Sequence, residues 1–162
     1  MKKIMEMLQN MKAKNEKKDN KGFSLVELII VIAIMAILVG IVGTQVLPYI
    51  NKSKEAKDLQ IINSYGTAAT TAYSSNAEKV TADVDVTISD TVPTAEPQLT
   101  LYNEIKNLTN FTTINALQNQ MGSTKGKTID SIKISIDFSA KTITTQAYSG
   151  TTAIFDPVVT KL

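Results

Sequence analysis

The first third of the chain contains one long apolar run. From Phe23 to Gly43 the sequence reads FSLVELIIVIAIMAILVGIVG, in which only Ser24 and Glu27 are polar. A helix of this length spans about 30 Å, the thickness of the hydrocarbon core of a bilayer. The alternative is a helix buried inside the chain's own globular part, but the rest of the chain is too small to surround it. Since no polar stripe follows Glu27, the pattern predicts a membrane-inserted helix.

Beyond Pro48 the pattern becomes amphipathic. Apolar and small residues recur every three or four positions, as on one face of a helix: Leu59, Ile62, Tyr65 or Gly66, Ala69 and Tyr73. We therefore expect one long helix from about Ser24 to about Ser75, apolar all round in its first half and on one side in its second half. That second half needs a cover.

The C-terminal part of the chain is predicted to cover this face with a sheet, because its apolar and polar residues alternate with period two. Ile132, Ile134, Ile136 and Phe138 alternate with polar residues, which predicts a half-buried strand. We expect a turn at 139–141, a returning strand from Ile143 to Tyr148 and a third from Thr151 to Phe155. Upstream, the sequence suggests an edge strand at 84–88, a loop marked by Pro93 and Pro97, and a short helix at 99–108. The predicted fold class is α+β, a long N-terminal helix packed on a small antiparallel sheet.

Charge is concentrated ahead of the apolar run. Residues 1–22 carry seven lysines against three acids, so this leader nets +4 and the remainder −2. Positive flanks stay cytoplasmic, which places the C-terminus outside. An ordinary secretory signal is disfavoured because the 21-residue run is long for one and a small-residue cleavage pattern is weak.

Composition excludes several kinds of chemistry. The chain has no Cys, His or Arg, so it lacks a disulfide framework, a thiolate nucleophile, an imidazole base and the usual bidentate reader of phosphate or guanine. No motif singles out a catalytic Ser, Lys or Asp. We expect no enzyme activity, no cofactor, no metal and no nucleic-acid partner.

Glu27 stands out inside the apolar run. A carboxylate there costs roughly 2.5–3.5 kcal/mol on insertion scales, and such residues usually have a partner and a function. It could simply reach the interface from its place near one end. A plain membrane anchor, however, would lose nothing by carrying Leu at this position.

The segment Lys21-Gly22-Phe23-Ser24-Leu25-Val26-Glu27, followed at once by the apolar run, resembles the class III signal of type IV pilins and pseudopilins. That signature is a basic leader ending in Gly, then Phe, Ser or Thr, Leu, an aliphatic residue and Glu. The resemblance implies cleavage between Gly22 and Phe23 by a membrane-bound prepilin peptidase, followed by N-methylation of Phe23. It also implies that Glu27 attracts the N-terminal ammonium of a neighbouring subunit during assembly.

The resemblance implies further partners and a location. Subunits would wait in the cytoplasmic membrane, be extracted by an assembly platform with its ATPase motor, and form a helical homopolymer on the cell surface. One departure is that Thr44 stands where many family members carry a helix-distorting Pro. Gly40, Gly43 and Pro48 lie nearby instead. They predict a weak zone that bends or unwinds in the filament, or they simply pack against lipid or neighbouring helices.

These observations divide the chain into a cleaved leader (1–22), an apolar helix (23–43), its amphipathic continuation (44–75) and an exposed head (76–162). The preferred function is a type IV pilus subunit for adhesion, surface motility or colonisation. A pseudopilin of a secretion or DNA-uptake system and a membrane-anchored binding module are the alternatives. A sizeable head favours the pilus, and the lack of Cys and Arg favours a Gram-positive host. Within the family the chain most resembles a type IVa-like major pilin of such a host.

Two segments of the head suggest other chemistry. Asp83, Asp85 and Asp90 invite a calcium site, although their spacing is not that of an EF-hand and solvated acids are the commoner reading. The run Gly122–Thr128 resembles the end of a phosphate-binding loop, but it lacks the required glycine spacing and a preceding apolar strand. We interpret it as a surface turn.

Overall fold

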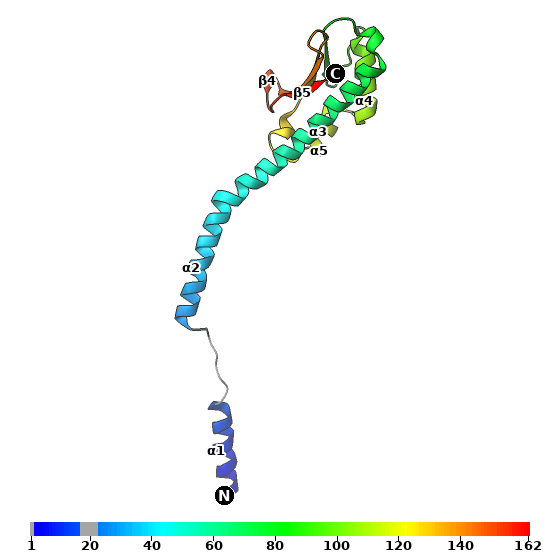
Figure 1. Ribbon diagram of the computed structural model, residues 1–162. Coiled ribbons are helices and arrows are strands. Elements are labelled where there is room, and N and C mark those ends of the chain that lie inside the picture. The colour runs from blue at the N-terminus through cyan, green and yellow to red at the C-terminus, as the bar shows by residue number, and fades with distance from the viewer. Residues whose placement is uncertain (1, 17–22) are drawn as a thin grey trace. The chain divides into compact units, whose positions relative to one another are not determined.

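The structure is a computed structural model that describes residues 2–16 and 23–162 (Figure 1). It divides into two compact units, Met1–Val46 and Leu47–Leu162. Gly22, on the N-terminal side of the expected cleavage, lies outside the described residues.

The first unit is helical. It contains α1 (Lys2–Glu16), α2 (Leu25–Ile41) and a π-helical turn, η1 (Val42–Val46). The 17 residues of α2 are aliphatic apart from Glu27, Met35 and the small residues Ala33, Ala36 and Gly40, and every one of them is exposed. Nothing in the described chain covers this helix.

The second unit begins with α3 (Leu47–Ser75), which continues the helical residues without a gap, so the helix predicted to end near Ser75 does end there. One face of α3 is buried: Asp58, Ile62, Tyr65, Gly66, Ala68, Ala69 and Ala72. Small residues on this face allow a close approach to the sheet. A Cβ added at Gly66 would lie 3.1 Å from Thr145 Oγ1, tighter than ordinary van der Waals contact.

The cover is a five-stranded antiparallel sheet in the order β1-β2-β3, with β4 and β5 both paired to β3. Its strands are β1 (Val84–Ile88), β2 (Ser131–Asp137), β3 (Thr142–Ser149), β4 (Thr152–Ala153) and β5 (Val158–Lys161). The register places Val86 beside Ile134 and Ile134 beside Thr145. The alternating isoleucines of β2 therefore do face the core, and the α+β fold class is confirmed.

Two strand predictions need correction. The third predicted strand covers Thr151–Phe155, but β4 has only two residues, because the chain turns inward to bury Phe155 against the core. The strand β5 was not predicted, since Pro157 and a short alternation precede the C-terminus. The hairpin turn lies where it was predicted, with Lys141 in the left-handed region (φ 56°) and Ala140 N donating to Asp137 Oδ1 at 2.6 Å.

Short helices complete the head. The predicted helix at 99–108 is α4 (Gln98–Thr109), which ends at Asn110 in the left-handed conformation. Three were not predicted: α5 (Ile114–Gln120) and two 3₁₀ turns, η2 (Ala77–Lys79) and η3 (Gly126–Thr128).

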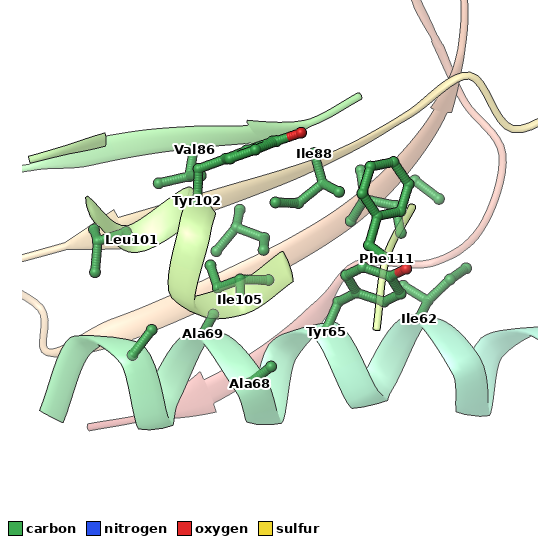
Figure 2. Close-up of a cluster of buried hydrophobic side chains, with 14 of the residues drawn as sticks. Ile62, Tyr65, Ala68, Ala69, Val86, Ile88, Leu101, Tyr102, Ile105 and Phe111 are labelled. Carbon is green, nitrogen blue, oxygen red and sulfur yellow. The ribbon is translucent and has the colours of Figure 1, made fainter. Parts of the chain in front are cut away.

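The core lies between α3, α4 and the sheet. Figure 2 shows Leu101, Tyr102 and Ile105 of α4 pointing into the space between β1 and α3. The Tyr102 hydroxyl donates to the Ser89 carbonyl at 3.0 Å, which satisfies its polar end while the ring stays buried. This packing holds the head together without a disulfide.

Candidate functional site

The start of α2 is built by a reciprocal cap. Ser24 is the N-cap residue, and its Oγ accepts from Val26 N at 3.3 Å. In return Glu27 Oε2 accepts from Ser24 N at 2.8 Å, which completes a capping box. Glu27 therefore starts the helix and also places a negative charge at the positive end of the helix dipole.

Glu27 stays exposed despite this local hydrogen bond. Among the described residues the one ion pair joins Lys133 to Asp85, in the other unit, so no described lysine neutralises Glu27. Phe23, the residue expected to carry the new N-terminus, is 84% exposed. The cleavage prediction itself involves Gly22, which is outside the described residues, and it stays a prediction.

The weak zone contains a change of helix type. Val42–Val46 form a π turn between α2 and α3. Pro48 has no N–H to donate to the carbonyl of Thr44, four residues earlier, and proline commonly disturbs the α-helical ladder at such a place. The Thr44 hydroxyl donates to the Gly40 carbonyl at 2.9 Å. Bending or unwinding of this zone in a filament stays a prediction.

The two glycines of this zone are not demanded by space within the described chain. A Cβ at Gly40 or at Gly43 would meet nothing within 4 Å. Small residues on apolar helices are typical of close helix–helix contacts in membranes. Packing within the described chain therefore does not explain glycine at these two positions.

The three acids that suggested calcium each have a separate structural partner. Asp83 accepts from Phe138 N at 2.9 Å, Asp90 accepts from Ile114 N at 2.8 Å, and Asp85 pairs with Lys133 at 2.8 Å. Over the described ranges no three acidic side chains converge into a group that could hold a metal ion. The carboxylates thus fix a turn, a helix start and a strand pair.

The loop that resembled a phosphate-binding loop surrounds a carboxylate from its own chain. Asp58 of α3 is fully buried and accepts from Gly122 N at 2.7 Å, Ser123 N at 2.9 Å and Ser123 Oγ at 2.5 Å. Gly126 N in turn donates to Ser123 Oγ at 2.8 Å. Because Asp58 occupies these donors, the loop is an internal tether and not an open anion site. It is also less exposed than the surface turn we expected, since Ser123 and Gly126 are buried.

Two features of this site were missed at the level of sequence, although signals for both exist. The Ser24-x-x-Glu27 spacing ahead of an apolar run is the signature of a capping box. Asp58 falls on the same helical stripe as Ile62 and Tyr65, at i, i+4 and i+7, which places it on the buried face. A buried acid on such a stripe needs hydrogen-bond donors from another segment.

A hollow beside the start of α4 has a structural role. It has a volume of about 410 Å³ and is lined by Lys79, Glu96, Pro97 and Thr100. Glu96 Oε2 accepts from Thr100 N at 3.2 Å and from its hydroxyl at 2.7 Å, so the acid closes the first turn of α4. The side chains there stabilise a helix end and do not form a nucleophile with its base.

Comparison with known proteins identifies the N-terminal segment. Residues 17–43 match the prokaryotic N-terminal methylation motif. The chain therefore carries the class III signal peptide of type IV pilins, and its long helix and small antiparallel sheet are consistent with the pilin fold. Pilins and pseudopilins share this motif, and the match covers the N-terminal segment alone. No curated protein and no solved structure matches the chain.

The same segment is able to cross a membrane. The helical stretch Leu25–Ser75 contains a window long and apolar enough for a bilayer, and that window is entirely unburied by the rest of the chain. Together with the methylation motif this supports membrane anchoring before assembly.

Proposed function

We propose that the chain is the major subunit of a type IV pilus. The observation that carries the proposal is that all 17 residues of α2 are exposed in a chain that otherwise buries a regular core. An apolar helix without an internal cover needs lipid or other apolar helices around it. Exchange of lipid contacts for helix contacts lets the same surface serve first in the membrane and then in a filament.

Processing would supply the charge that makes Glu27 useful. A cut between Gly22 and Phe23 by prepilin peptidase leaves an ammonium on Phe23, which is then methylated. In the apolar filament core that ammonium and the Glu27 carboxylate of a neighbouring copy neutralise each other, whereas either charge alone would be costly. The existing capping box does not replace this pairing, because the Ser24 amide carries no charge.

The head would coat the filament. Its core is closed by α4 and the sheet, while the outward side chains of the central strands are polar, among them Ser135 and Thr144. Such a surface suits contact with water on the outside of a filament, and the role we propose for that filament is adhesion, colonisation or surface motility. The assembly platform, its ATPase motor and further copies of the chain would be the partners. The π turn supports a weak zone around Gly40, Gly43 and Pro48 that bends or unwinds in the filament.

Three variants separate the charge of Glu27 from its capping role. Glu27→Gln keeps the capping box, which Gln also forms, but removes the charge. Glu27→Ala removes both, and Ser24→Ala removes the hydroxyl half of the cap while keeping the charge. We expect all three to insert and to be cleaved, and only Ser24→Ala to yield filaments in sheared fractions.

The readouts are immunoblots of the membrane and sheared fractions, with the size shift on cleavage as an internal control. Wild-type amounts of filament from Glu27→Gln would show that Glu27 acts as a cap and that no charge pairing drives assembly. Filaments absent from wild-type cells, with the cleaved chain kept in the membrane, would favour a pseudopilin.

A further inference from the structure

The leader contains a helix with two faces. Within α1 (Lys2–Glu16), four large apolar side chains between 60% and 72% exposed project from residues 2–10: Ile4, Met5, Met7 and Leu8. At 100° per residue they fall within an arc of about 160°, and the other five of residues 2–10 are polar and lie on the remaining arc: Lys2, Lys3, Glu6, Gln9 and Asn10. This is the pattern of a helix that lies on an apolar surface.

The helix α1 lies outside the processing motif, and the described part of the chain does not pack against it. The methylation motif begins at residue 17, downstream of α1. Each described side chain of residues 2–10 is exposed, so the described chain does not cover the apolar face. A helix of 15 residues is also marginal in water unless something packs against it.

The short connection between α1 and α2 holds α1 close to the membrane that α2 is expected to cross. Nine residue steps separate Glu16 from Leu25, the first residue of α2. Even a fully extended chain of that length spans about 30 Å, so α1 ends within that distance of the membrane-spanning helix. The leader also carries a net charge of +4, which suits the anionic cytoplasmic leaflet.

We propose that α1 lies flat in the cytoplasmic interface of the membrane, with Ile4, Met5 and Leu8 in the acyl boundary and its lysines on anionic headgroups. An amphipathic helix with lysines beside its apolar face binds such surfaces in this way. The orientation rests on the proposed function, which places the leader on the cytoplasmic side. There α1 would hold the bond between Gly22 and Phe23 near the membrane surface, where a membrane-bound peptidase works.

The test uses the full-length chain in vesicles of phosphatidylcholine and phosphatidylglycerol. Because the sequence has no Cys, single-cysteine variants carry one spin label each: Met5→Cys, Glu6→Cys, Leu8→Cys and Gln9→Cys. Collision with oxygen reports apolar surroundings and collision with a water-soluble nickel complex reports water. We expect labels at positions 5 and 8 to favour oxygen and those at 6 and 9 to favour nickel.

A matched pair of variants checks the face. With the label at Met5→Cys, Leu8→Glu should abolish the oxygen preference, whereas Gln9→Glu, the same charge change one residue along on the polar face, should keep it. Nickel access at all four positions would overturn the proposal by placing α1 in water. Spin–spin broadening at positions 5 and 8 that disappears on dilution with unlabelled chain would overturn it in favour of a second copy.

This measurement requires neither cleavage nor filaments. The interfacial helix therefore fails if the labels lack periodicity even where the same chain forms pili. Conversely, a chain that never assembles can still show the periodic pattern. The failure to assemble would contradict the proposed pilus subunit, and the pattern would support the interfacial helix.

Discussion

Replacing Asp58 by Ala isolates the interaction that ties α3 to the loop at 122–126. Without the carboxylate, Ser123 N and Ser123 Oγ lose their acceptor in a buried site, and Gly122 N loses its own at the edge. Each buried donor left unsatisfied costs about 1–3 kcal/mol, so we expect a loss of about 3 kcal/mol in the free energy of unfolding of the head. That is a large share of the stability of an ordinary domain.

Asp83→Ala is the matched control. Asp83 also accepts one backbone N–H across a long sequence separation, from Phe138 at 2.9 Å, but it is exposed. Water can replace that bond, so we expect a loss of about 1 kcal/mol or less. Asp58→Asn, which keeps the size and one oxygen acceptor, serves if Asp58→Ala does not fold. It should lie between the other two.

The assay is urea unfolding of the full-length chain in detergent, followed by the near-ultraviolet circular dichroism of its tyrosines. The sequence has five tyrosines and no Trp, and Tyr65 of α3 and Tyr102 of α4 are buried in the core. The urea dependence should stay unchanged while the midpoint falls. If Asp58→Ala and Asp83→Ala destabilise the head equally, the buried tether does not exist as described.

Two further predictions use the same assay. Thr145 is buried and its Oγ1 has no partner among the described residues, so Thr145→Val should raise the free energy of unfolding by about 1 kcal/mol. The control is Thr144→Val, half-buried on the other face of β3, which should change the free energy of unfolding by less than about 0.5 kcal/mol. Equal effects of the two variants would contradict an unsatisfied hydroxyl at Thr145. A hydrogen bond from Lys133 lowers the pKa of Asp85 below 3.8, and Asp85 in turn raises the pKa of Lys133 above 10.5. The lowered pKa of Asp85 means that its carboxylate stabilises the fold above pH 3.8, and the raised pKa of Lys133 means that its ammonium stabilises the fold below pH 10.5. Between those limits this exposed pair should make the free energy of unfolding of the wild type about 0–1 kcal/mol higher than that of Asp85→Asn. The difference should disappear as the pH falls below the lower limit. A wild type that is still more stable than Asp85→Asn at pH 2 would refute this account of the ion pair.

The parts of the fold that were predictable follow from simple periodicity. The alternation of Ile132, Ile134 and Ile136 specifies one buried face, and the next apolar residues after the turn must pair with it in register. The long helix was equally clear, because an apolar run leads directly into an amphipathic stripe. Both patterns are local, and each follows from which side of an element is buried.

What could not be predicted depends on contacts distant in sequence. The loop at 122–128 looks like a surface turn until Asp58, more than 60 residues earlier, supplies the acceptor for its N–H groups. The strand β5 adds to β3 because β4 is short and leaves the other half of that edge open. No local pattern at Val158–Lys161 indicates this pairing.

The candidate site was predictable to a different extent. Glu27 stands out because a lone acid inside an apolar run requires an explanation, and Phe23 and Glu27 both lie within the matched segment, residues 17–43. Their roles stay predictions. The capping role of Glu27 was also readable, from Ser24 three residues before it. In the proposed function the partner that neutralises Glu27 lies in a neighbouring subunit, so measurements on assembled material are needed to test it.

Intact-mass spectrometry of material sheared from the native host tests the central claim most directly. We predict abundant filaments built from this chain, with a mass that begins at N-methylated Phe23 and covers the 140 residues that remain after cleavage behind Gly22. A chain that starts at Met1, uncut and absent from the sheared fraction, would contradict the pilus subunit and favour a membrane-anchored binding module.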